Sequence, residues 1–280
     1  MTSNHTTMQL PEGYEIRRLE REHLPWVQAI VGHTMSFDSP IWSKVSYEAW
    51  RTQRAYDMYH AIAASALQSI DFGLSYGVFL TNHSCRIPGE EGRLEWNFGD
   101  AAVTREQLLD QMDFPLVSIA LSKDAAAPKP PTAVGVRFWG DIVHGHNDIS
   151  AGLKAGDARD PQIWAPEREG EVVRRSGTHT RGDHTGRGLA RALAHRVMRE
   201  VRDDERRKFR AILIHTGAEA VNRVWLHPPA PFHAELVSTF DTACFTRGGG
   251  GTGEVVYNPF GTAKVECKRI WITWPAKENC

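Results

Sequence analysis

The sequence predicts an α/β fold of the α+β type: a mixed, mainly antiparallel, twisted sheet flanked by helices, with insertions. One observation is a strand-like run at residues 171–178, followed by a glycine-rich turn, a helix and an apolar strand at residues 210–215. Strand, crossover helix and strand form a right-handed parallel connection. The other observation is that hydrophobic residues make up 41% of the 280 residues, which supports a real core.

The helix after the turn has the clearest pattern in the chain. Leucines and valines recur every four residues at Leu189, Leu193, Val197 and Val201. Arginines fall mainly on the remaining face, at Arg191, Arg196, Arg199 and Arg202. One apolar stripe with charge opposite predicts an amphipathic helix that packs on the sheet.

The remaining elements follow from apolar periodicity and turn residues. Strands are expected at residues 14–19, 72–80, 116–121, 134–139, 235–245 and 269–274. Helices are expected at residues 22–32, 47–69, 104–112 and 219–226. Irregular segments are expected at residues 36–40, 82–99, 125–131, 143–166 and 247–253. No repeat or boundary interrupts this order, so residues 1–280 are interpreted as one domain with a tail at residues 1–13.

Composition argues against several classes of protein. The formal net charge of −1 gives no electrostatic footprint of a nucleic-acid binder, and the apolar runs are too short for a membrane span. The N-terminus lacks the basic and apolar regions of a signal peptide. The four cysteines show no paired spacing, which predicts free thiols in a reducing, cytoplasmic compartment. The closest histidine clusters, His144 with His146 and His179 with His184, lack zinc-site spacing, so no metal is predicted.

The glycine-rich turn at residues 181–188 carries the most chemical information. A strand, a glycine turn and a helix mouth aim backbone N–H groups at a phosphate, and glycine lets the backbone approach closely. A Walker-type loop ends in Gly-Lys-Ser/Thr, and a dinucleotide fingerprint needs a third small residue; this turn offers neither. The plain alternative is a flexible surface loop before a core helix.

The turn resembles the pyrophosphate-binding motif of the GNAT acyltransferase superfamily, Gln/Arg-x-x-Gly-x-Gly/Ala. The matching run is Thr185-Gly186-Arg187-Gly188-Leu189-Ala190. Gly188 and Ala190 match the small positions, whereas Thr185 departs from Gln or Arg, with Arg187 and Arg181 nearby. The resemblance covers residues 170–275, the cofactor-binding half. The whole chain also resembles uncharacterised fungal GNAT-like proteins, which share the phrases at residues 114–118 and 228–232.

The resemblance implies binding of acetyl-CoA or another acyl-CoA and acyl transfer to a small-molecule amine or alcohol. The strands at residues 171–178 and 210–215 would splay apart around the pantetheine arm. The residues implied to line that arm are Arg175, Ser176, Gly177 and Thr178. The run from Thr185 to Ala190 would hold the pyrophosphate.

Four residues are candidates for proton transfer to and from the amine and the thiol. His215 ends the second splayed strand, His179 lies near the end of the first, and Glu219 opens the following helix. Their plain interpretations are a core histidine, a loop residue and a helix-start carboxylate. The family often uses a tyrosine in its last helix as the acid. Trp225 stands there, and an indole cannot serve as an acid, so His227 or water would replace it.

Three functions therefore stay open on the sequence: a coenzyme A-dependent acyltransferase, a protein of this fold that binds an acyl-CoA or another ligand without transfer, and a non-transfer chemistry such as a lyase or cyclase reaction. Fold alone does not decide between them, because function is set by the site. The oligomeric state also stays open.

Overall fold

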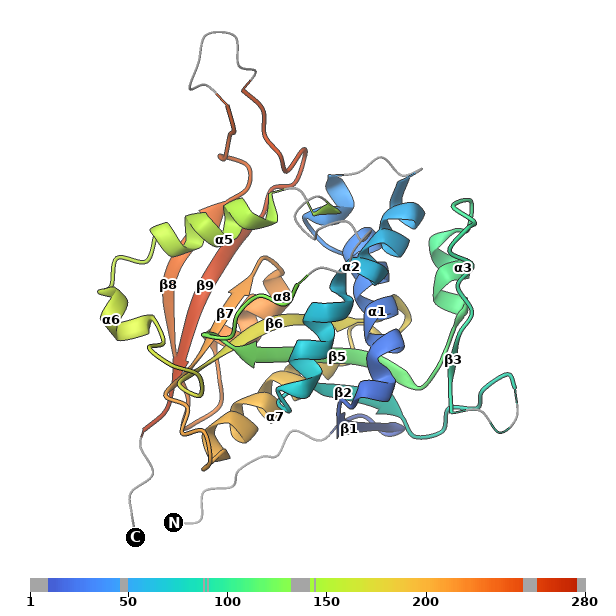
Figure 1. Ribbon diagram of the computed structural model, residues 1–280, viewed down its shortest axis with the longest axis horizontal. Helices are drawn as coiled ribbons and strands as arrows, with labels where there is room; N and C mark the ends of the chain where they lie inside the picture. The colour runs from blue at the N-terminus through green and yellow to red at the C-terminus, as the bar shows by residue number, and fades with distance from the viewer. Residues whose placement is uncertain are drawn as a thin grey trace.

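The computed structural model describes residues 10–45, 50–87, 89, 91–131, 142–143, 145–248 and 256–275. Its centre is a seven-stranded sheet in the order β1-β2-β5-β6-β7-β9-β8 (Figure 1). The strands are β1 (Tyr14–Arg18), β2 (Tyr76–Leu80), β5 (Leu116–Asp124), β6 (Val172–Thr180), β7 (Ala211–Thr216), β8 (His233–Asp241) and β9 (Glu266–Thr273). β6 and β7 pair in parallel and all other neighbours in this sheet pair antiparallel. The predicted mixed, mainly antiparallel sheet is confirmed.

Helices cover both faces of the sheet. They are α1 (Leu24–Phe37), α2 (Arg51–Asp71), α3 (Arg105–Asp110), α5 (His146–Ala155), α6 (Pro161–Trp164), α7 (Leu189–Asp203) and α8 (Glu219–Leu226). A small second sheet pairs β3 (Arg93–Leu94) with β4 (Met112–Asp113). Figure 1 shows α1, α2 and α5 on the near side. No helix in the described residues is both long and apolar enough to span a membrane.

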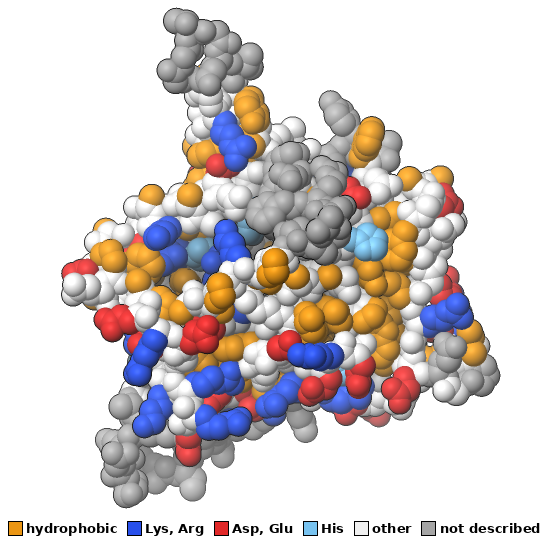
Figure 2. All heavy atoms as spheres, viewed as in Figure 1, with side chains coloured by type: hydrophobic (Ala, Val, Ile, Leu, Met, Phe, Trp, Pro, Cys, Tyr) orange, Lys and Arg blue, Asp and Glu red, His pale blue; other side chains and the backbone are white. Residues whose placement is uncertain are grey.

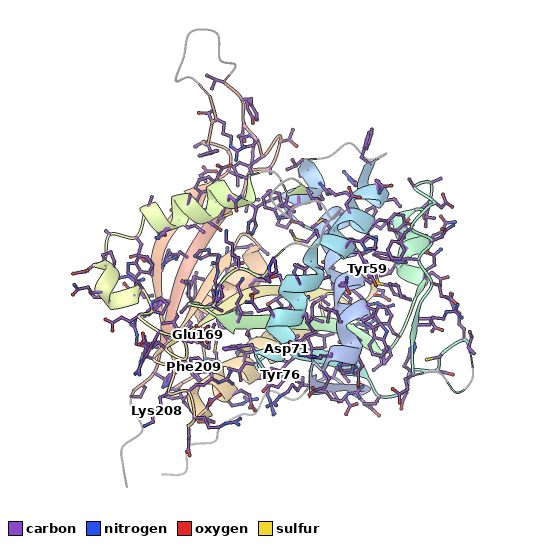
Figure 3. All side chains as sticks on the ribbon, viewed as in Figure 1. Tyr59, Asp71, Tyr76, Glu169, Lys208 and Phe209 are labelled. Carbon is purple, nitrogen blue, oxygen red and sulfur yellow. The ribbon has the colours of Figure 1, made fainter. Side chains whose placement is uncertain are left out.

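Two hydrophobic clusters hold α7 on one face of the sheet and α1 and α2 on the other. The stripe of α7 packs on Val173, Ile212 and Ile214 of the central strands. Tyr76 and Phe209, labelled in Figure 3, belong to the same core. On the opposite face α1 and α2 pack on residues of β5 that include Leu116 and Ile119. The sheet therefore has an α7 face and an α1/α2 face.

The two central parallel strands splay apart. β6 pairs with β7 only where residues 172–174 meet residues 211–213, although both strands continue beyond that point. On its other side β6 contains a bulge: Arg175 lies opposite Ser122 and Gly177 opposite Leu121, which leaves Ser176 without a partner. A bulge bends and twists its strand, so it helps to turn β6 away from β7. The predicted parallel, splayed pair is confirmed.

Several boundaries differ from the sequence prediction. Residues 143–166, predicted as an irregular connection, contain α5 and α6, because Ile149 and Leu153 of α5 are buried one turn apart. α1 runs to Phe37, into the loop predicted at residues 36–40, because Thr34 and Ser36 are buried in the protein. The polar excursion at residues 82–99 contains β3.

Other strand ends also move. In β2, β5, β8 and β9, strand pairing places one or both ends of the strand one to four residues from the predicted end. β2 begins at Tyr76 rather than residue 72, because α2 runs to Asp71 and Gly73 turns the chain with a φ of +81°. The strand predicted at residues 134–139 lies outside the described residues, as does most of the glycine-rich tip at residues 247–253.

Candidate functional site

The turn before α7 has an open helix N-terminus. Gly188 is the residue that precedes the helix, and its φ of +76° is one that side-chain-bearing residues rarely adopt. No side chain caps α7, so its first backbone N–H groups have no side-chain acceptor. Leu189 is 2% exposed and anchors the helix in the core. Arg187 and Arg191 are exposed, and neither makes a hydrogen bond or ion pair with the described residues.

The other residues of the turn are also at the surface. Thr185 is extended, and its hydroxyl donates to the carbonyl of Gly182 at 3.0 Å. Gly186 is exposed and has a φ of +76°, whereas Ala190 is half-buried in the first turn of α7. The side chain of Thr185 therefore shapes the turn, and the backbone groups that follow it face solvent.

Arg175 fills the bulge of β6. Its guanidinium donates to the Leu121 carbonyl and the Ser122 hydroxyl on β5, and to the Gly177 carbonyl and the Thr178 hydroxyl further along β6. The side chain is 5% exposed, and burial lowers its pKa to about 9. Of the residues predicted to line a cofactor arm, Ser176 is exposed, Gly177 and Thr178 are half-buried, and Arg175 holds the bulge together.

His179 lies on the α1/α2 face, directly after the bulge. Its Nδ1 is 2.8 Å from the Thr34 hydroxyl of α1. Its Nε2 faces Gly177, because a Cβ built on that glycine would lie 2.7 Å from Nε2. Burial, together with the charge of Arg175, lowers the pKa of His179 to about 4, so the ring is neutral at pH 7.

His215 lies on β7 beside an arginine rather than a carboxylate. Nη1 of Arg269 donates to Nε2 of His215 at 2.9 Å. An arginine has only donors, so the lone pair of Nε2 is occupied and Nδ1 carries the proton. Burial and the nearby Arg174 and Arg269 lower the pKa of His215 to about 3.

The remaining candidates lie at the two ends of α8. Glu219 is exposed at the first residue of the helix and pairs with Arg223 at 3.5 Å. His227 follows the last residue and is exposed. Trp225 is 1% exposed in the core, and the Arg175 guanidinium lies 5.7 Å from the centre of its ring.

Sequence reasoning missed the partners of the histidines. Thr34 is 145 positions from His179, and Arg269 is 54 positions from His215. Strand alternation offers a signal for the second pair, because Arg269 lies opposite His215 in the antiparallel register of β7 and β9. Elsewhere, His83, Cys85 and Asp113 place possible metal-ligand atoms within 4.8 Å of one another. The absence of a metal stays a prediction.

Comparison with known proteins bears on the fold. By sequence, no family profile and no curated protein matches the chain. By structure, it is similar to the C-terminal condensation domain of Ebony in complex with beta-alanyl-dopamine, with a TM-score of 0.61, 15% identity and coverage of 94% of this chain and 99% of that one. A putative arylalkylamine N-acetyltransferase 7 of Aedes aegypti has a TM-score of 0.57 and 10% identity, and the match covers 92% of this chain and 86% of that one. A polyamine N-acetyltransferase of Drosophila melanogaster has a TM-score of 0.52 and 11% identity, and the match covers 94% of this chain and 100% of that one.

These similarities extend over nearly all of the chain at low identity. They show that it has the fold of GNAT N-acetyltransferases, as the turn motif predicted. They do not bear on the resemblance to fungal proteins, which stays a prediction.

Proposed function

We propose that the chain is an acyl-CoA-dependent N-acyltransferase, with acetyl-CoA as the expected donor and a small-molecule amine as the acceptor. The observation that carries the proposal is the splay between β6 and β7, together with the uncapped N-terminus of α7 that follows β6. The Aedes aegypti and Drosophila melanogaster neighbours are named for acetyl transfer to arylalkylamines and polyamines, and this supports an amine as acceptor. Transfer to an alcohol is the broader alternative.

The cofactor would be held by backbone groups. The run from Thr185 to Ala190 suits the pyrophosphate, because a helix N-terminus offers free N–H groups and a positive dipole end to an anion. Arg187 and Arg191 add two cations at the same helix mouth, and neither has a partner among the described residues. Beyond Arg174 the β7-facing edge of β6 has no strand partner among the described residues, so peptide groups on this edge can bind a pantetheine arm. Ser176, Gly177 and Thr178 follow Arg174 along this part of β6, where the Gly177 carbonyl already accepts from Arg175.

We assign His179 as the base. Thr34 donates its single hydroxyl proton to the Ile30 carbonyl at 2.7 Å, so His179 Nδ1 must be the donor of the 2.8 Å contact between them. The lone pair then lies on Nε2, the atom that faces Gly177 on the splayed strand. A thioester supplies an acyl carbon that an amine can attack and a thiolate that can leave.

The proton balance follows from that assignment. The amine nitrogen bonds to the acyl carbon, the carbon–sulfur bond breaks, and His179 Nε2 takes the proton that the nitrogen loses. Attack makes the nitrogen positively charged and strongly acidic, so a weak base is sufficient. The thiolate takes a proton from water or from His227. Trp225 is buried in the core, and its indole has no proton to give at neutral pH.

One observation favours a second function. Trp225 stands where the family often places a tyrosine acid, and Arg175 contacts it through a ring face. A protein of this fold that binds an acyl-CoA without transfer, or that performs a non-transfer reaction such as lyase or cyclase chemistry, would need no such acid. Binding and turnover must therefore be measured separately.

Calorimetry with acetyl-CoA tests binding. We expect Gly188→Asp to weaken binding at least tenfold, because it places a carboxylate at the helix mouth. Gly73→Asp is the matched control: Gly73 has a φ of +81° and open space around it, as Gly188 has, but it lies between α2 and β2. Equal affinity in the two folded variants would refute the assignment of the turn. Thiol release with arylalkylamines and agmatine then separates transfer from binding alone.

A further inference from the structure

Cations gather on one face of the splayed strands. Arg174 of β6 lies opposite Lys123 of β5 and opposite Leu213 of β7 in the registers of these strand pairs. Leu213 and His215 share a face because they are two residues apart, and His215 lies opposite Arg269 of β9.

Ile212 and Ile214 face α7, so this group lies on the α1/α2 face, as His179 does. Figure 2 shows Lys and Arg side chains beside histidine on this face, next to α5.

Two donors in this group have no acceptor among the described residues. Nη2 of Arg269 and Nδ1 of His215 are buried and make no hydrogen bond within the described part of the chain. Because Arg269 occupies Nε2 of His215, the proton of the neutral ring must lie on Nδ1. A buried N–H without an acceptor is costly, so two of them in one bonded pair indicate a missing acceptor group.

The positive charge of the group is only partly compensated by the carboxylates of the described residues. Asp157 is its buried carboxylate, and it is already shared between Arg159 at 2.9 Å and Arg269 at 3.1 Å. Arg174 and Lys123 make no ion pair or side-chain hydrogen bond in the described residues, although both are more than half buried. Burial and like charges lower the pKa values of both side chains. Half-buried cations without a counter-ion are rare unless a ligand completes them.

We propose that Arg174, His215 and Arg269 form a subsite for a carboxylate of the substrate. A carboxylate has two oxygens that accept N–H bonds, and its charge would balance the guanidinium of Arg174. The proposal rests on the proposed acyl transfer. Arg174 is the last residue of β6 that pairs with β7, so the subsite lies at the vertex of the splay. The carboxylate comes from either a dicarboxylic acyl chain or an amino-acid acceptor.

Two ligand pairs distinguish these sources. Succinyl-CoA and butyryl-CoA differ by a terminal carboxylate on a four-carbon acyl chain. Tyrosine and tyramine differ by a carboxylate on the acceptor amine. Calorimetry on the full chain measures both pairs without turnover, the second in the presence of CoA. We expect the carboxylate member of one pair to bind about tenfold to a hundredfold more tightly, the range of one charge-assisted hydrogen-bonded pair.

Variants link the preference to the subsite. Arg174→Gln should abolish it, and without ligand its melting temperature should equal or exceed that of the parent, because an unpaired cation is removed. Lys268→Gln is the matched control: the residue precedes Arg269 on β9, points to the other face, and pairs with Glu266 at 3.1 Å. This control should keep the preference.

Absence of a preference in both pairs, or a preference that survives in Arg174→Gln, overturns the subsite. Transfer of acyl groups without any such preference rejects the subsite alone. A preference that Arg174→Gln removes, in a protein that transfers nothing, rejects the transferase and leaves the subsite standing.

Discussion

The hydroxyl of Thr34 on α1 lies 2.8 Å from Nδ1 of His179 on β6, a contact that joins a helix to the splayed strand across 145 positions of sequence. Since Thr34 donates its own proton to Ile30, this contact fixes which ring nitrogen of His179 carries a proton. The basic nitrogen is then the one that faces Gly177. Thr34 is therefore a positioning residue for the proposed base.

Thr34→Val removes the acceptor of His179 while keeping the shape of the side chain. We expect kcat to fall about tenfold, less than the roughly 10²–10⁴-fold contribution of a positioned acid or base because His179 itself remains, with little change in KM for the thioester. Thr34→Ser keeps a hydroxyl and should retain most of the activity. Equal kcat values for the valine and serine variants would contradict the tautomer argument.

Stability should fall with acid between pH 6.5 and pH 4. His179 and His215 have folded pKa values of about 4 and about 3, both below the ordinary 6.5. Below pH 6.5 the unfolded chain binds protons at these histidines and the folded chain does not. Each histidine therefore lowers the free energy of unfolding by up to about 1.4 kcal/mol per pH unit. Urea unfolding at pH 7, 6 and 5 measures this slope. His215→Gln should flatten it, and an unchanged slope would mean that His215 does not titrate in this way.

The central unit was predictable because its pattern is local. Four apolar residues at helical spacing and two glycines identify α7 and its turn without any tertiary contact. α5 was missed because only Ile149 and Leu153 of its ten residues are buried, and both pack on strands distant in sequence. His179 and His215 were identifiable as residues near strand ends. The partners that distinguish them were not predictable, because Thr34 contacts His179 and Arg269 contacts His215 only in the folded chain.

Charge reversal at the helix mouth should weaken cofactor binding in a salt-dependent manner. Arg187→Glu places a negative charge beside the proposed pyrophosphate, and we expect the affinity for acetyl-CoA to fall about tenfold at low ionic strength. The loss should shrink above 0.5 M salt, where charges are screened within about 5 Å. Arg199→Glu makes the same change on an exposed residue about 15 Å further along the axis of α7. A similar loss in both variants would indicate net charge rather than a site.

Arg175 should contribute to stability through the bulge. Arg175→Met leaves the carbonyls of Leu121 and Gly177 without this donor in a buried position. Each such carbonyl costs about 1–3 kcal/mol, offset in part because the desolvated charge is gone. We expect a net loss of about 2 kcal/mol in the free energy of unfolding, and weaker acetyl-CoA binding along the altered edge of β6. A variant as stable as the parent would show that the bulge forms without the guanidinium.

The pH profile of transfer assigns the acid and the base. If His179 is the base, its pKa of about 4 keeps it unprotonated above pH 5, so the acidic limb of kcat/KM should lie below the usual histidine range. His179→Ala should remove that limb and lower the rate throughout. His215→Ala should leave the limb in place, because Arg269 occupies Nε2 and the ring has no free lone pair. His227→Ala should lower the rate of transfer if this exposed histidine protonates the thiolate, and should change nothing if water does. A parent-like profile in His179→Ala together with loss of the acidic limb in His215→Ala would reverse the assignment, since the proton would then pass through the β7 histidine.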